Sequence, residues 1–146
     1  MKLFLLEAPV GRSRDIALLL ARILLAVIFV PSGFAKLGHF AAFADSLGAK
    51  GLPLPFLWAL GAVAAEFLGG LCILFGLAMR PVALLMVVFV AFTAVLGHPF
   101  WAADAAHYQA QYINFMKNVA IMGGFLALFV GGPGRISLDR ALWSQR

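Results

Sequence analysis

The chain has 146 residues, of which 64% are hydrophobic and only 12% are charged. A soluble domain of this length would be poorly solvated with so few charges, so the composition favours long apolar segments in a membrane. The net charge of +5 is spread over the ends of the apolar segments and forms no basic groove, which argues against nucleic-acid binding. With Cys72 as the single cysteine, an intramolecular disulfide and a paired-thiol redox motif are both excluded.

Four stretches are long and apolar enough to cross a membrane as helices, which takes about 20 residues each. They cover residues 16–36, 55–79, 81–97 and 112–132. Backbone polar groups in lipid need internal hydrogen bonds, and these stretches lack the period-two alternation of barrel strands. We therefore expect an all-α integral membrane protein, a four-transmembrane-helix bundle with short interfacial helices in its outer loops. The membrane domain is expected over 16–135, after an interfacial segment 1–15 and before a basic tail 136–146 that lies on the surface.

The connections between the spans differ in length and character. Residues 37–54 carry hydrophobic side chains at the three-then-four spacing of an amphipathic helix and end in GLPLP, which predicts a short surface helix. Arg80 and Pro81 alone join the second and third spans, so these two spans should form a tight hairpin. Residues 98–111, HPFWAADAAHYQAQ, are typical of a polar and aromatic interfacial loop.

Basic residues are divided unequally between the two ends of the predicted bundle. Seven lie on the side that holds both termini and the middle hairpin, and two lie on the other side. The larger set is Lys2, Arg12, Arg14, Arg80, Arg135, Arg140 and Arg146, and the smaller set is Lys36 and Lys50. Because cytoplasmic loops carry the excess of Lys and Arg, we predict that both termini are in the cytoplasm.

Three of the four spans carry an ionisable residue inside the apolar run. A charge near the bilayer centre costs about 2.5–3.5 kcal/mol on insertion scales, so it should face protein or water and have a partner. Arg22, Glu66 and Lys117 each share a helix face with small residues, which let helices approach closely. Glu66 lies between the two cations in depth, so we expect it to pair with Arg22 or Lys117, whose long side chains can lean toward it. The alternative, given equal weight, is that these charges only fix helix register.

The two buried cations outnumber the one anion, which predicts a polar pocket in the outer half of the bundle. We expect it to open at PSG, residues 31–33, where Pro31 loosens the helix, and to have Phe34, Trp58 and Trp101 at its mouth. The ligand-binding candidates are Arg22, Lys36, Glu66, His98, Asn114, Lys117 and Asn118. The alternative occupant of the pocket is ordinary lipid or water. Nothing in the spacing of the histidines fixes a metal geometry, so no metal ligand is assigned.

Five short motifs, taken in chain order, resemble the DoxX family. They are SGFAKL, F..F...L...GLPLP, EFLGG, GHPFW and NFMKN.A..GG, and the resemblance covers residues 16–135. DoxX proteins are small four-helix bacterial membrane proteins, and the family name comes from a membrane subunit linked with thiosulfate:quinone oxidoreductase. The resemblance implies a multi-pass protein of the bacterial inner membrane that meets quinone. By motif, it directs attention to Arg22, Lys36, Glu66, His98, Lys117 and Asn118.

Three functions are compatible with these features. The first, which the resemblance favours, is a quinone-linked membrane component of an oxidoreductase complex, with the redox centre in a partner protein and no cofactor in the chain itself except a quinone. The second is a transporter for a small anion or weak acid, with Arg22, Glu66 and Lys117 as its site. The third is a structural or chaperone-like subunit that binds other membrane proteins.

We also expect a homo-oligomer in contact with membrane lipid, because the span 81–97 carries no charge and offers the apolar surface LLMVVFV.

Overall fold

The computed structural model describes residues 10–143, and within them four helices are long and apolar enough to cross a membrane. Helix α1 spans Arg12–Gly38, α5 spans Met79–Gly97 and α6 spans Tyr108–Gly131. The remaining span, Pro55–Phe75, is built from three consecutive pieces. These are α3 (Pro55–Val63), the π-helical η1 (Ala64–Gly69) and α4 (Gly70–Phe75). The predicted all-α fold with four spans is confirmed.

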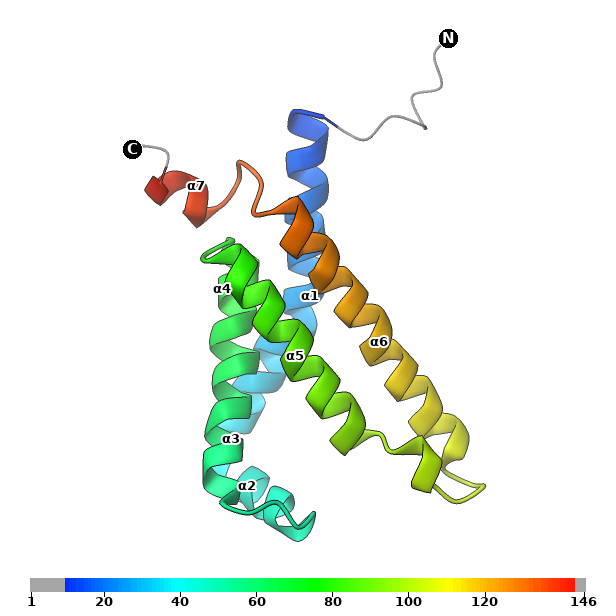
Figure 1. The fold of residues 1–146 in the computed structure, drawn as a ribbon. Helices are drawn as coiled ribbons and strands as arrows, with labels where there is room; N and C mark the ends of the chain where they lie inside the picture. The colour runs from blue at the N-terminus through cyan, green and yellow to red at the C-terminus, as the bar shows by residue number, and fades with distance from the viewer. Residues whose placement is uncertain (1–9, 144–146) are drawn as a thin grey trace.

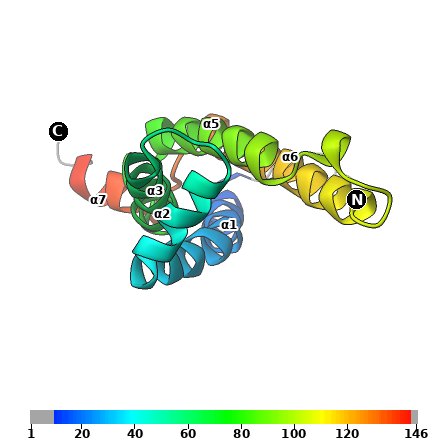
Figure 2. The ribbon, with the colours of Figure 1, turned by 90° about the horizontal axis from the view of Figure 1, so that it is seen from below.

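Both described ends of the chain lie at one end of the bundle, which we call the terminal end (Figure 1). The opposite end, the loop end, carries α2 (Phe40–Ala49) and the 3-10 helix η2 (Phe100–Ala102). Helix α2 confirms the surface helix predicted in residues 37–54, and it packs against α3. Figure 2 views the molecule from the loop end and shows the paired helices α5 and α6, with the first part of α6 extending away from α1.

The helices pack around a core in which glycine permits the closest approach. A Cβ at Gly33 of α1 would lie 2.5 Å from the backbone nitrogen of Phe67 in η1, so only glycine fits there. Phe29 and Phe125 meet in the core with ring centroids 5.4 Å apart. On the second span the predicted small-residue face is buried at Glu66, Gly69, Ile73 and Gly76. Gly69 of this face lies against Met86 of α5, and the neighbouring Gly70 lies against Val30 of α1, so small residues let the second span approach both helices closely.

The irregular backbone lies in the second span, and not at Pro31. Helix α1 runs without interruption from Arg12 to Gly38 with Pro31 inside it. Pro31 thus does not break α1, and the expectation that it loosens the helix to open a pocket stays a prediction. The facing segment η1 is π-helical instead, and it carries Glu66. Short π-helical turns inside α-helices occur frequently at functional sites.

The segment after α6 is tied to the bundle more firmly than the prediction of a surface tail implied. It leads into α7 (Leu138–Trp143), whose Asp139 carboxylate accepts hydrogen bonds from the N–H groups of Ala78, at 2.7 Å, and Met79, at 2.9 Å. These bonds satisfy unpaired donors at the start of α5. The Asp139 N–H also donates to the Gly76 carbonyl at 3.0 Å. Residues 1–9 and 144–146, with Lys2 and Arg146, lie outside the described residues.

Candidate functional site

A cavity of about 840 Å³ lies in the loop half of the bundle, the half in which the sequence predicted a polar pocket. Side chains from α1, α2, the second span, α5 and α6 line it. Its polar lining is Ser32, Lys36, Lys50, Glu66, Thr93, His98, Gln111 and Asn118. Its aromatic lining is Phe29, Phe43, Trp58, Phe89 and Phe92. We call it the loop-half cavity.

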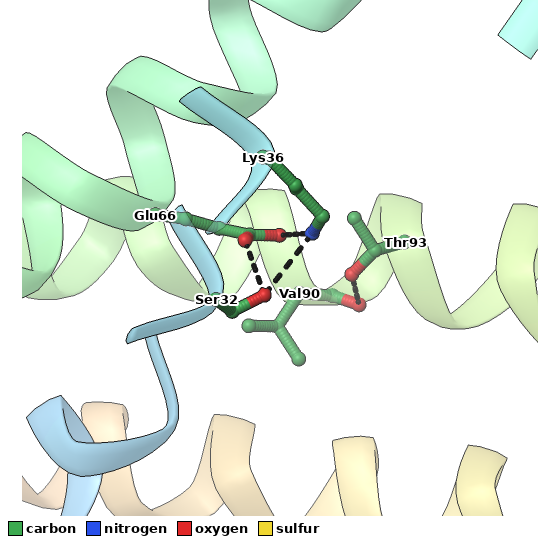
Figure 3. Close-up of polar contacts among 5 residues, drawn as sticks. All are labelled: Ser32, Lys36, Glu66, Val90 and Thr93. Carbon is green, nitrogen blue, oxygen red and sulfur yellow. Dashed lines mark hydrogen bonds and ion pairs between the residues drawn. The ribbon is translucent and has the colours of Figure 1, made fainter. Parts of the chain in front are cut away.

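An ion pair between Lys36 of α1 and Glu66 of η1 forms part of the wall of this cavity (Figure 3). Ser32, one turn before Lys36, donates a hydrogen bond to Glu66 Oε2 at 2.7 Å, and Lys36 Nζ bonds the other carboxylate oxygen, Oε1. Lys36 Nζ also donates to Ser32 Oγ at 3.3 Å. The Glu66 side chain is 9% exposed and that of Lys36 is 29% exposed. Each carboxylate oxygen thus accepts one hydrogen bond, and the less buried ammonium also lies 5.1 Å from the centroid of the Phe43 ring.

The expected pairing of Glu66 with Arg22 or Lys117 is wrong, because Lys36 takes that place. Burial of Glu66 in the bundle interior is confirmed, since the residue as a whole is 6% exposed. The partner is different because Ser32 and Lys36 lie one helical turn apart on α1, and η1 lies against this part of α1. The long stem of lysine reaches a carboxylate that lies deeper than its own Cα.

Arg22 lies at the terminal end of the bundle and does not line the loop-half cavity. Its Nη1 donates hydrogen bonds to the carbonyls of Pro133, at 2.6 Å, and Ile136, at 2.7 Å. Its Nη2 donates to the carbonyl of Leu74 at 2.9 Å. Arg22 is only 2% exposed, so its charge is compensated by backbone dipoles at the end of α4 and in the segment after α6. For this residue the structure agrees with the interpretation that a buried charge fixes packing.

Lys117 and Asn114 also lie outside the lining of the cavity. Lys117 is exposed, and its Nζ donates to Asn114 Oδ1 at 3.4 Å. Asn118, the next residue, does line the cavity, together with Gln111 and Ile121. One residue turns a helix by about 100°, so neighbours point to different sides. The predicted surplus of a buried cation at Lys117 is therefore wrong.

His98 directly follows α5 and lines the loop-half cavity. Its Nδ1 is 2.9 Å from Gln111 Oε1 of α6, a hydrogen bond that fixes the orientation of the imidazole ring. Thr93, five residues earlier, donates to the Val90 carbonyl at 3.1 Å. Gln111 was not among the sequence candidates, although its spacing of seven from Asn118 places both on one helical face.

The other histidine of the loop end is not part of the cavity. His107 contacts Asp104, with Nδ1 2.7 Å from Oδ1, and this hydrogen bond lowers the pKa of the Asp104 carboxyl below its usual value. Both residues are well exposed, so the pair is solvated. His98 and His107 thus bind different partners.

Of the three aromatic residues predicted at the mouth of the pocket, only Trp58 lines it. Trp58 stacks on Phe92, with ring centroids 5.2 Å apart and planes 17° apart. Phe34 packs on Phe67, and Trp101 packs on Phe100 and Phe115. The predictions for Phe34 and Trp101 are wrong, because they belong to separate aromatic clusters.

Fold and cavity together define a small multi-pass membrane protein that holds a partly buried ion pair in the wall of a polar and aromatic cavity. The DoxX family model matches residues 17–99, and the chain belongs to the DoxX family. It is similar to the inner membrane protein YphA of Escherichia coli, with 40% identity over 89% of this chain and 93% of that protein. It is also similar to the inner membrane protein YqjF of the same bacterium, with 37% identity over 88% of this chain and 93% of that protein. No solved structure matches the chain.

Proposed function

We propose that this protein is a quinone-linked membrane component of an oxidoreductase complex, and that the head group of the quinone binds in the loop-half cavity. The observation that carries the proposal is the Lys36–Glu66 ion pair in a wall that also holds aromatic rings. A volume of about 840 Å³ lies within the range of small-molecule sites, which is about 300–1,000 Å³.

The residues present fit a quinone head group chemically. A quinone has a flat ring with carbonyl oxygens that accept hydrogen bonds. The Lys36 ammonium carries three N–H donors, of which two are directed to Glu66 and Ser32. It also lies 5.1 Å from the centroid of the Phe43 ring, which is part of the cavity lining. Asn118 and His98 supply further polar groups on the opposite helices, and the Trp58–Phe92 stack supplies an apolar face.

The ion pair gives the site its electrostatic character. A bound quinone supplies the electron-accepting chemistry. The Lys36 charge is held by Glu66 in a region of low dielectric constant, where its field acts more strongly than in water. A preorganised cation of this kind stabilises negative charge that develops on a nearby oxygen. The chain's own role is therefore to bind and orient the head group and to hold a proton at Lys36 Nζ.

A partner protein would supply the electrons. Paired-thiol chemistry is excluded by the single cysteine, Cys72, which is partly buried in the second span. The transport hypothesis loses support, because its three-residue site is dispersed: Arg22 binds carbonyls at the terminal end, and Lys117 is exposed. The names of YphA and YqjF support a location in the inner membrane.

The test is a binding measurement on the protein in nanodiscs with short-chain ubiquinone and menaquinone analogues. We expect Lys36→Gln and Glu66→Gln to bind about tenfold more weakly than wild type, the size that one charge-assisted hydrogen bond gives. Lys117→Gln is the matched control, because this lysine lies outside the cavity lining and should leave the affinity unchanged. Equal affinity in all variants, or no saturable binding, would refute the quinone site.

Mass spectrometry of proteins that copurify in mild detergent tests the second half of the proposal. A flavin- or metal-containing oxidoreductase is the expected partner. A stable complex with a membrane protein that carries no redox group would favour the structural or chaperone-like role instead.

A further inference from the structure

A second cavity, of about 720 Å³, lies at the terminal end of the bundle. It is formed where α1 begins, where α4 turns into α5, and where α6 ends and leads into α7. Four arginines and two aspartates contribute its charged lining. They are Arg14, Arg80, Arg135, Arg140, Asp15 and Asp139. We call it the arginine cavity, and the proposed quinone site makes no use of it.

The two aspartates of the arginine cavity are engaged by backbone groups. Asp15 is 7% exposed, and its Oδ1 accepts the N–H of Arg135 at 2.9 Å. Asp139 accepts the two N–H groups at the start of α5. No ion pair joins either aspartate to an arginine of this lining among residues 10–143. Four formal positive charges therefore face two carboxylates, of which Asp139 has both oxygens and Asp15 has Oδ1 engaged by backbone N–H groups.

The arginines, by contrast, keep most of their donors. Arg14 donates one hydrogen bond to the Gly131 carbonyl. Within the described part of the chain, the guanidinium groups of Arg80, Arg135 and Arg140 make no hydrogen bond or ion pair with another residue. Each guanidinium carries five N–H donors in a planar fork, which matches the oxygens of a phosphate.

The position of these arginines is built by the tertiary structure. Buried Arg22 binds the carbonyls of Pro133 and Ile136 on either side of Arg135. Gly134 adopts a left-handed conformation, with φ of 74°, which turns the chain next to Asp15. Asp139 attaches α7 to the α4–α5 turn. Hydrogen bonds thus hold segments that are far apart in the sequence around one cavity. The arginines of its lining are therefore placed by the fold and are not scattered over the surface.

We propose that the arginine cavity binds a phosphate ester, and that its source is the head group of an anionic phospholipid. The cavity lies where the membrane-spanning helices end, which is the depth of lipid phosphates. Bidentate contacts between arginine and phosphate are among the stronger charge-assisted hydrogen bonds. Basic pockets between membrane helices bind anionic lipid head groups by this chemistry.

The experiment titrates delipidated full-length protein in detergent with phosphatidylglycerol, phosphatidylcholine or sn-glycerol 3-phosphate, and measures bound ligand by native mass spectrometry. We expect wild type to bind phosphatidylglycerol about tenfold more tightly than phosphatidylcholine. The double variant Arg80→Gln/Arg135→Gln should lose this preference. Arg12→Gln is the matched control, since Arg12 is exposed at the same end of the bundle but lies outside the lining.

Three results would overturn the proposal. Both lipids carry a phosphodiester, so equal binding by wild type would show that the cavity does not select an anionic head group. An equal loss of preference in Arg12→Gln and in the double variant would reduce it to the general attraction of a basic surface. Binding of glycerol 3-phosphate as tightly as phosphatidylglycerol would assign the phosphate to a soluble molecule and exclude the lipid source. Because the side chains of Arg12, Arg80 and Arg135 make no hydrogen bond or ion pair within the described part of the chain, circular dichroism should find both variants folded. Quinone binding by the double variant should be unchanged, so the two sites are tested separately.

Discussion

The Arg22 guanidinium packs against Gly76, the residue that directly follows α4. A Cβ added at Gly76 would lie 2.8 Å from Arg22 Nη1 and 2.7 Å from the Cβ of Ser137. Gly76 also has a φ of 67°, in the left-handed region that glycine adopts without strain. The absence of a side chain at this position thus gives the buried guanidinium a path to the carbonyls of Leu74, Pro133 and Ile136.

Gly76→Ala should lower the free energy of unfolding by about 1–3 kcal/mol from left-handed backbone strain alone. A steric clash with Arg22 adds to this loss. The measurement is the free energy of unfolding in mixed micelles, together with the thermal midpoint. Gly123→Ala is the control: Gly123 is exposed within α6, and an added Cβ would meet nothing within 4 Å. It should be neutral or slightly stabilising, since alanine is the better helix former. Equal destabilisation by both changes would contradict the role assigned to Gly76.

Arg22→Met should loosen the segment after α6. The change leaves carbonyl groups without donors, and each unsatisfied buried group costs about 1–3 kcal/mol. Trypsin cleavage after Arg135 should then be faster than in wild type. The rate is measured by mass spectrometry of the fragments. Arg12→Met is the control, because Arg12 is exposed and should leave the cleavage rate unchanged. A cleavage rate in Arg22→Met that equals wild type would show that the three hydrogen bonds do not hold this segment.

The pairing of Glu66 with Lys36 can be tested by a double-mutant cycle. Glu66→Gln and Lys36→Met should each lower the free energy of unfolding, because each leaves a partly buried charge without its partner. The combined variant should be more stable than the sum of the two changes predicts, with a coupling of about 1–3 kcal/mol. The same cycle with Lys117→Met in place of Lys36→Met should give no coupling. A coupling to Lys117 as large as that to Lys36 would restore the pairing predicted from sequence.

We predict that the terminal end faces the cytoplasm, on the basis of the unequal distribution of basic residues. Single cysteines at Gly48 and Asp104, in a Cys72→Ser background, should react with a membrane-impermeant thiol reagent added outside the inner membrane. Both positions are exposed at the loop end. Ile136, exposed at the terminal end, supplies the opposite control and should react only after permeabilisation. The reverse labelling pattern would invert the topology.

The protein should form a homo-oligomer in the membrane. Leu84, Leu85 and Val88 of α5 are exposed, and so is Lys117 of α6, which lies within a membrane-spanning helix. A lysine in such a position is costly in lipid, and a neighbouring protomer would cover it. Light scattering in several mild detergents measures the mass of the protein alone. A monomer in every detergent would count against the prediction. In that case the Lys117→Leu variant should have the same measured mass as wild type.

Sequence by itself was sufficient for the features that depend on local pattern. The four spans, the surface helix in 37–54 and the burial of Glu66 follow from hydropathy and from the spacing of small residues along one helix. Each of these is a property of a single segment, because a helix satisfies its own backbone and its period of 3.6 residues fixes which side chains share a face. The same reasoning identified Arg22, Lys36 and Glu66 as residues that require an explanation.

The tertiary structure alone decided which of these residues meet. Whether Glu66 reaches Lys36, Arg22 or Lys117 depends on the crossing of two helices and on their rotation, and one residue changes that rotation by about 100°. This is why Asn118 lines the loop-half cavity and Lys117 does not. Two further features were invisible in any single segment. The π-helical turn that carries Glu66 arises where α1 packs against the second span, and the arginine cavity assembles from three parts of the chain. Partner choice in a bundle is a relation between helices, and no local periodicity encodes it.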